Sequence, residues 1–450
     1  GDKIFFVQLA DAPMIEMDLL YWSRHFRNMP GEGDLPICKF MGAVMASGYQ
    51  GPISLEIFND QFRGGSPKMV ATDGYRSLIA LMDDVRHDEH HPKFEGPTIP
   101  PRIKVKGVSF IEFATRGSQI AELETILSTL GFVKAAKHKS KVVTVWQQGD
   151  IRIVINSEPT GHARSAYTLH GTSVCDIGLD VASATQTLER AVALGIVPFE
   201  QEVGSSELAI PAIHGLSGSV LHFLDSSSGL ADVWDTEFDS LEPSNKPQGG
   251  LVRIDHLAQT MSYSDMLSWS LFYSSLFDMK KAAMVDVIDP DGIVRSQALE
   301  TSDGEFRITL NGAETHRTLA GGFLSDTFGS SVQHMAFSSD DIFGIVEALA
   351  KNGFEPLPIP TNYYDDLATR FDLDSDLLAS MKDANILYDR DDNGDFFQIY
   401  SRPYGDGLFF EIVERRDGYA GYGAPNAPFR IAAQKRLMRP KGMPKRQPID

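Results

Sequence analysis

The sequence predicts an α/β segment followed by an α+β module that contains two copies of one strand-and-helix unit. Residues 1–92 alternate short apolar strands with helical stretches, while residues 103–243 and 251–430 repeat the same order of strands and helices. The second copy also has three residues of the types that bind metals, each within a short apolar run. These residues are His256, His334 and Glu411.

The composition predicts a folded protein that acts on small molecules. The chain has 450 residues, of which 42% are hydrophobic and 23% are charged, and its formal net charge is −20. This acidic balance argues against nucleic acid and anionic membranes as partners. Only two cysteines occur, and no run of 18 apolar residues is present, so we expect a cytoplasmic protein without disulfide bonds.

Residues 1–92 have the pattern of βα units that pair in a parallel sheet. Apolar strands at 4–10 and 53–58 alternate with helical stretches at 35–48 and 71–88. The chain begins without Met and almost inside a strand, so we expect it to be part of a longer polypeptide. Proline and charge dominate residues 93–102, which we interpret as a linker.

The two copies of the repeat differ at the candidate ligands. Superposing them places His256 on Phe110, His334 on Asp176, and Glu411 on His222. The first copy is therefore degenerate, and only the second keeps three ligand types. The second copy also has an insertion at 361–387, which is polar, acidic and aromatic. We expect this insertion to be partly helical and to cover a pocket.

Two imidazoles and one carboxylate form the ligand set of non-haem Fe(II) oxygenases. A single histidine in an apolar strand is more often a hydrogen-bonded core residue. A buried glutamate without a partner is costly, however, and three such residues at matching repeat positions favour a metal site. Beyond the repeat, residues 431–450 are basic and proline-rich, which predicts a flexible, solvated tail.

Residues 103–430 resemble 4-hydroxyphenylpyruvate dioxygenases, which are members of the vicinal oxygen chelate superfamily. The resemblance rests on DHLAQT, SVQHMAF and DDNGDFFQIYSRPYGDGLFFEIVERR, which surround the three candidate ligands in the family's order. It implies paired βαβββ modules, with Fe(II) or another divalent metal in the second repeat. An aryl keto acid is the implied ligand. The implied substrate contacts are Ser296, Asn311, Gln333 and Gln398.

Two departures from this family affect the substrate. The closing segment reads GYAGYGAPNAPFRIAAQKRL, and a family glutamine upstream of the second ligand has no counterpart in HRTLAGGFLSD. Three alternatives therefore stay open for this module: a dioxygenase for the family's substrate, a dioxygenase for another keto acid, or a non-catalytic module that dimerises the protein.

Residues 1–92 resemble the C-terminal part of a sugar-phosphate isomerase/epimerase-like TIM barrel. The matching motifs are VQLADAP, SRHFRNMPGEGD, SLEIFNDQF and GYRSL. The resemblance implies that Gln8 and Glu56 are the last two of four ligands to Mg, Mn or Co. It also implies that Arg27 is a catalytic residue that faces an anionic substrate group. The first two ligands and the base are expected upstream.

A barrel followed by a dioxygenase-like module resembles the fused 3-dehydroshikimate dehydratases of bacteria. The resemblance covers nearly the whole chain, and it implies conversion of 3-dehydroshikimate to protocatechuate in quinate and shikimate catabolism. It also implies a homo-oligomer. The barrel metal would act as a Lewis acid on the substrate ketone.

Overall fold

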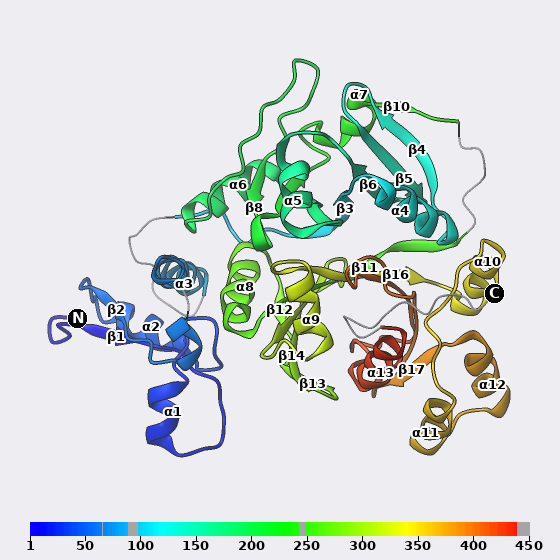
Figure 1. The fold of residues 1–450 in the computed structure, drawn as a ribbon. Helices are drawn as coiled ribbons and strands as arrows, with labels where there is room; N and C mark the ends of the chain where they lie inside the picture. Colours follow the sequence, from blue (N-terminus) through cyan, green and yellow to red (C-terminus); the bar gives the residue numbers. More distant parts are fainter. Residues whose placement is uncertain (65, 89–97, 243–248, 439–450) are drawn as a thin grey trace.

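The computed structural model describes residues 1–64, 66–88, 98–242 and 249–438. The chain forms a small N-terminal α/β part and two large curved sheets with helices on their faces (Figure 1). The two sheets pack together through one continuous hydrophobic core, in which Phe132 contacts Phe337 with ring centroids 5.5 Å apart. Within the described residues, no helix is long and apolar enough to span a bilayer.

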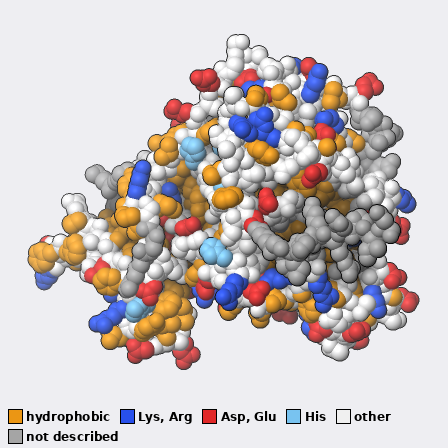
Figure 2. Space-filling model, viewed as in Figure 1, with side chains coloured by type: hydrophobic (Ala, Val, Ile, Leu, Met, Phe, Trp, Pro, Cys, Tyr) orange, Lys and Arg blue, Asp and Glu red, His pale blue; other side chains and the backbone are white. Residues whose placement is uncertain are grey.

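The N-terminal part contains a parallel pair of strands, β1 (Val7–Leu9) and β2 (Ile53–Leu55). Its helices are α1 (Leu19–His25), α2 (Ile37–Ala46), η1 (Asp60–Gly64) and α3 (Pro67–His87). Strand β1 packs against α2 and α3 in a small apolar core. Large apolar side chains gather on the surface of this part (Figure 2), including Phe5, which is 86% exposed, and Leu19, which is 73% exposed.

The first repeat forms an eight-stranded sheet in the order β10-β4-β5-β6-β3-β7-β9-β8. Its strands are β3 (Val105–Ala114), β4 (Val133–His138), β5 (Val143–Gln148), β6 (Ile151–Asn156), β7 (Ser173–Val181), β8 (Ala212–His214), β9 (Val220–Leu224) and β10 (Phe238–Ser240). Its helices are α4 (Ser118–Thr129), α5 (Gly161–His170), α6 (Ala184–Ala193), η2 (Leu216–Gly218), η3 (Leu230–Asp232) and α7 (Val233–Glu237).

The second repeat forms a nine-stranded sheet in the order β12-β14-β15-β11-β16-β19-β18-β17, and β13 pairs with β14. Its strands are β11 (Leu251–Ser262), β12 (Lys280–Lys281), β13 (Val285–Asp289), β14 (Gly292–Glu300), β15 (Arg307–Ala313), β16 (Ser331–Ser339), β17 (Leu387–Arg390), β18 (Asp395–Tyr400) and β19 (Phe409–Arg415). Its helices are α8 (Tyr263–Leu276), α9 (Leu319–Asp326), α10 (Ile342–Lys351), α11 (Asn362–Arg370), α12 (Ser375–Ala384), η4 (Ala424–Asn426) and α13 (Ala427–Leu437).

Side-chain caps fix where several of these helices begin. Ser183 starts α6, Thr318 starts α9, Asp341 starts α10 and Asp374 starts α12, and in each case the side chain accepts a hydrogen bond from a backbone N–H of the first turn. Such a cap satisfies a donor that has no partner within the helix.

The strand registers confirm the predicted superposition of the two repeats. Glu112 pairs with Asp176 across β3 and β7, as Ala258 pairs with His334 across β11 and β16. Gly178 then pairs with His222 across β7 and β9, as Ala336 pairs with Glu411 across β16 and β19.

One of two expectations about the C-terminal third needs correction. The insertion at 361–387 is helical, as predicted, because it contains α11 and α12. The flexible tail, however, does not begin at residue 431. Helix α13 continues to Leu437 because its apolar face is buried, with Ile431 only 3% exposed. Residues 439–450 lie outside the described residues.

A buried arginine connects the three parts of the chain. Arg190 of α6 is fully buried, and its guanidinium pairs with Asp83 of α3 at 2.9 Å. It also donates to the carbonyl of Ser275 on α8 at 2.8 Å and to that of Pro100. The N-terminal part is therefore joined to both repeats at one point, where removing a single partner would leave a buried charge unpaired.

We predict that Asp83→Ala lowers the free energy of unfolding by about 3–5 kcal/mol, because it strands the buried Arg190 guanidinium. Urea denaturation followed by tryptophan fluorescence measures this change. The matched control is Asp84→Ala, which removes a half-exposed ion pair to Arg102 and should cost less than about 1 kcal/mol. Equal losses in the two variants would contradict the role given to Arg190.

Candidate metal centre

Three neighbouring strands bring the predicted ligands of the second repeat onto one face of the sheet. His256 of β11 pairs with Ala336 of β16, and Ala336 pairs with Glu411 of β19. His334 lies two residues before Ala336 and so points to the same face. Ala336 and Ala258, both fully buried, leave space between the larger side chains.

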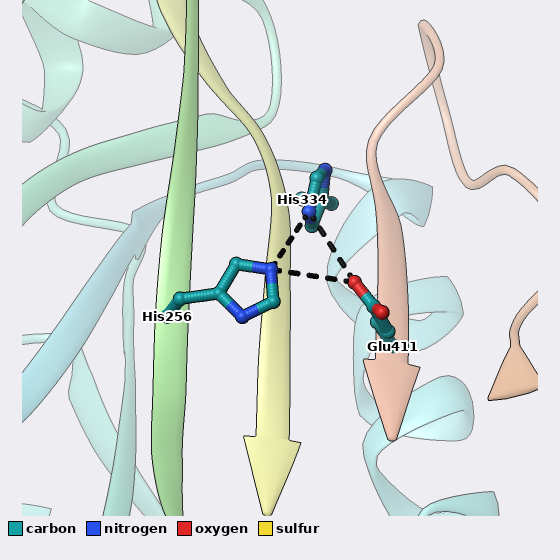
Figure 3. A group of neighbouring side chains, drawn as sticks. All are labelled: His256, His334 and Glu411. Carbon is teal, nitrogen blue, oxygen red and sulfur yellow. Dashed lines mark hydrogen bonds and ion pairs between the residues drawn. The ribbon is translucent and has the colours of Figure 1, made fainter. Parts of the chain in front are cut away.

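The three ligand atoms form a nearly equilateral triangle (Figure 3). The Nε2 atoms of His256 and His334 are 3.3 Å apart, and each is 3.4 Å from Oε2 of Glu411. The centre of a triangle with 3.4 Å sides lies about 2.0 Å from each corner, which is a normal bond length from a divalent transition metal to imidazole or carboxylate. The residues therefore fit a metal ion.

Asp255 orients the imidazole of His256 for this role. Its Oδ1 lies 2.8 Å from Nδ1 of His256, so Nδ1 carries the proton and Nε2 presents its lone pair toward the triangle. Burial lowers the pKa of His256, but its hydrogen bonds with Asp255 and Glu411 raise it above the usual value overall. A bound metal would replace the proton at Nε2.

Arg415 fixes Asp255 in turn. Its Nε and one terminal nitrogen contact the two carboxylate oxygens of Asp255 at 2.9 and 3.0 Å, which is a bidentate pair. Burial raises the pKa of Asp255, but the hydrogen bond with His256 and the ion pair with Arg415 hold it well below the usual range. Arg415 also donates to the carbonyl of Gly421 at 2.6 Å, so it connects the metal centre to the closing segment.

His334 remains neutral in its buried position. Burial, followed by the charges of His256 and Arg430, lowers its pKa well below the usual value. Its ring stacks on Phe409 with centroids 4.7 Å apart, which fixes the ring plane. A neutral imidazole is the form that binds metals.

Gln398 holds Glu411 and is not among the residues that line the cavity, and its role as a substrate contact stays a prediction. Its amide nitrogen donates to Oε1 of Glu411 at 2.7 Å and to the Tyr400 hydroxyl at 2.9 Å, and its oxygen accepts from Asn426 at 2.8 Å. Both N–H groups of the Gln398 amide are therefore used, and its oxygen already accepts one hydrogen bond. Gln398 leaves Oε2 of Glu411 free to face the histidines.

A cavity of about 100 Å³ adjoins the three ligands. Three of the predicted substrate contacts line it, namely Ser296, Asn311 and Gln333. Ser296 and Asn311 pair across β14 and β15, and Gln333 accepts a hydrogen bond from Thr260 at 2.7 Å. The cavity wall includes residues of η4 and α13 and no residue of α11 or α12. The expectation that the insertion covers the pocket was therefore wrong.

Two residues of this site, Asp255 and Arg430, were not among those predicted from the sequence. Asp255 directly precedes the first histidine, so its position beside a candidate ligand was an available signal. Arg430 lines the cavity from α13, in the segment that sequence analysis noted only as a departure from the family. The approach of this segment requires glycine at 423, where a Cβ would meet the Gln398 side chain at 2.1 Å.

The equivalent positions of the first repeat do not form a metal site. Phe110 occupies the place of the first histidine, and Oδ2 of Asp176 lies 2.6 Å from Nδ1 of His222. An aromatic ring therefore replaces one ligand, and the remaining aspartate and histidine pair with each other.

A second cluster in the first repeat, His138 with Glu207 and Glu237, is poorly suited to a metal. Nδ1 of His138 accepts hydrogen bonds from the backbone N–H groups of Ser140 and Lys141, both at 3.1 Å. The neutral ring must then carry its proton on Nε2, which faces Glu237 at 3.3 Å. This cluster is a hydrogen-bonded network. The lone pair of His138 Nδ1 points toward two backbone N–H groups and away from the glutamates, so it cannot bind a cation between them.

Two of the three predicted barrel residues meet where β2 ends, while Gln8 is the middle residue of β1. Gln8 is an exposed residue of β1, and Glu56 follows β2. Arg27 contacts Glu56 Oε2 at 2.5 Å and lies over Phe58, 4.8 Å from the ring centroid. The structure thus brings Arg27 and Glu56 into an ion pair at the carboxyl ends of parallel strands, where α/β barrels place their chemistry.

Comparisons with known proteins match both parts of the chain. The model for the N-terminal domain of hydroxyphenylpyruvate dioxygenase matches residues 100–239, and that of the glyoxalase/bleomycin resistance protein/dioxygenase superfamily matches residues 253–391. A 3-dehydroshikimate dehydratase from Pseudomonas putida is 43% identical over 439 residues, which are 96% of this chain and 69% of that protein. A 4-hydroxyphenylpyruvate dioxygenase from Pseudomonas aeruginosa is 31% identical over 72% of this chain and 92% of its own length.

A solved structure has the same architecture. It is described as a xylose isomerase-like TIM barrel/4-hydroxyphenylpyruvate dioxygenase fusion protein, and it superposes with a TM-score of 0.87 at 42% identity. The match covers 97% of this chain and 70% of that one.

We predict that Asp255→Asn weakens Co²⁺ binding at the three-ligand site by about 10–100-fold, because the imidazole of His256 loses its carboxylate partner. Isothermal titration calorimetry, with the visible absorption of Co²⁺ as a second readout, measures the affinity. The matched control is Asp176→Asn, which alters the aspartate and histidine pair of the first repeat and should leave Co²⁺ affinity unchanged. Wild-type affinity in Asp255→Asn would contradict the assignment.

Proposed function

The chain belongs to the family of 3-dehydroshikimate dehydratases fused to a 4-hydroxyphenylpyruvate dioxygenase-like domain, and we propose that its barrel segment removes water from 3-dehydroshikimate to form protocatechuate. The observation that supports this proposal best is the 43% identity to a dehydratase across both the barrel segment and the two repeats. The product differs from the substrate by one water molecule, so the reaction needs no oxidant.

We assign the barrel site to Gln8, Glu56 and Arg27. Oxygen ligands of this kind suit Mg, Mn or Co. When bound, the metal would supply Lewis-acid polarisation of the substrate ketone. Arg27 is half-buried, and its ion pair with Glu56 holds it beside the strand ends. If Glu56 becomes a metal ligand, the guanidinium is released to bind the substrate carboxylate, for which its planar fork is well shaped.

We also propose that the C-terminal domain is a second catalytic centre, with Fe(II) or another divalent metal bound by His256, His334 and Glu411. Bound Fe(II) would supply the activation of O₂ beside an aryl keto acid. The residues of the cavity provide the remaining functions. Ser296 and Asn311 offer hydrogen bonds to substrate oxygens, and α13 closes one wall against water.

We predict that Glu56→Gln lowers kcat for dehydration by at least about 100-fold, because the barrel loses an anionic metal ligand and the partner of Arg27. The absorbance of protocatechuate measures the rate in the longer polypeptide that is expected to carry the other two barrel ligands and the base, supplied with Mg²⁺, Mn²⁺ or Co²⁺. The matched control is Asp60→Asn in the following turn, which pairs with His25 at 2.9 Å and should keep near-normal activity. A Glu56→Gln variant as active as the control would remove Glu56 from the site.

We predict O₂ uptake by the Fe(II)-loaded chain with at least one member of a panel of aryl keto acids. Glu411→Ala should abolish the uptake because one ligand is lost, while His222→Ala, its equivalent in the first repeat, should retain it. An oxygen electrode with parallel iron analysis gives the result. If iron is bound and no keto acid supports uptake, the domain is non-catalytic. Mass photometry, which measures the oligomeric state of the chain, would then test whether the domain dimerises the protein.

A further inference from the structure

An arginine that forms no ion pair with any described residue faces the candidate metal cavity. Arg430 of α13 lines the cavity together with all three proposed ligands. Its guanidinium lies over the ring of Phe409, 4.9 Å from the centroid, and over that of Tyr400, 5.6 Å away. One nitrogen donates to the neutral amide oxygen of Gln434 at 2.6 Å. Among the described residues, no carboxylate forms an ion pair with it.

Arg430 lies close to the metal ligands. Its guanidinium is 4.9 Å from the centroid of the Phe409 ring, which stacks on the His334 ring with centroids 4.7 Å apart. Arginine does not lose its proton at neutral pH, so this positive charge is permanent. A permanent charge within a half-buried cavity, without a counter-charge from the part of the chain that the structure describes, favours an anion in that place.

The other charged groups around the cavity are already matched. Asp289 also lines it, but its carboxylate pairs with Lys435 and accepts the backbone N–H of Leu319. Asp255 lies behind His256 and is held by Arg415. The groups left to interact with a ligand are Glu411, Arg430 and a divalent ion between neutral histidines, and their charges sum to about +2.

We infer that the ligand of this cavity is an aromatic compound with two anionic groups, one that binds the metal and a carboxylate that pairs with Arg430. This inference rests on the proposed metal centre. An aryl keto acid whose only anion is on the metal would leave Arg430 unpaired, whereas a second carboxylate would form a bidentate pair with it. Val294, Leu319 and Ile431 provide apolar walls for the ring.

Two kinds of compound share this chemistry, and the experiment separates them. One is a catechol with a ring carboxylate, which is the class of the dehydratase product, and the other is an aryl keto acid with a ring carboxylate. The probe pairs are 3,4-dihydroxybenzoate against catechol, and 4-carboxyphenylpyruvate against phenylpyruvate. The members of each pair differ only in the carboxylate proposed to reach Arg430.

Binding is measured by calorimetry to the full chain loaded anaerobically with Co²⁺. A His334→Ala chain is titrated in parallel, so that any binding by the barrel segment can be subtracted. In at least one pair, the carboxylate compound should bind about 10-fold or more tightly than its analogue. Arg430→Met should remove this preference, and Arg430→Lys should retain part of it. The control Arg436→Met, on the same helix, should keep the full preference.

The outcomes distinguish the two proposals. If the wild-type chain did not bind Co²⁺ at all, the proposed metal centre itself would be overturned. Normal Co²⁺ binding without a carboxylate preference in either pair, or with a preference that survives Arg430→Met, would overturn the role of Arg430. Circular dichroism and Co²⁺ affinity of Arg430→Met show whether the fold and the metal centre are intact.

Discussion

The register of three strands is the constraint on which the C-terminal site depends. His256, Ala336 and Glu411 occupy one row across β11, β16 and β19, and His334 occupies the next row on the same face. A shift of one residue in any of these strands would turn a ligand to the opposite face. Residues about 80 positions apart can therefore meet only because the whole sheet is formed.

A second constraint is the chain of contacts behind the site. Asp255 orients His256, Arg415 holds Asp255 by two nitrogens, and the same arginine donates to the backbone at Gly421. Gln398 similarly connects Glu411 to Asn426 at the start of α13. The segment that closes the cavity is thus tied to the metal ligands, so a ligand that contacts α13 also acts on the geometry of the centre.

Much of this architecture could be predicted from the sequence, because a repeat allows one copy to be checked against the other. The alignment of Phe110 with His256 and of Asp176 with His334 agrees with the strand pairings. The sequence could not show which segment closes the metal cavity, because α11 and α12 are polar helices whose position depends on tertiary contacts. The contacts of Gln398 could not be predicted for the same reason, since strand position shows which face a residue occupies and not whether a neighbour already uses its hydrogen bonds.

The central claim is that two imidazoles and one carboxylate meet around one cation. X-ray absorption of the Co²⁺-loaded chain tests it most directly, in a Glu56→Gln background that limits any contribution from the barrel. The account predicts a first shell with two imidazole nitrogens and carboxylate oxygen at about 2.0–2.2 Å, and the loss of one imidazole when His334 is replaced by alanine. A shell without imidazole, or one unchanged by that replacement, would contradict it.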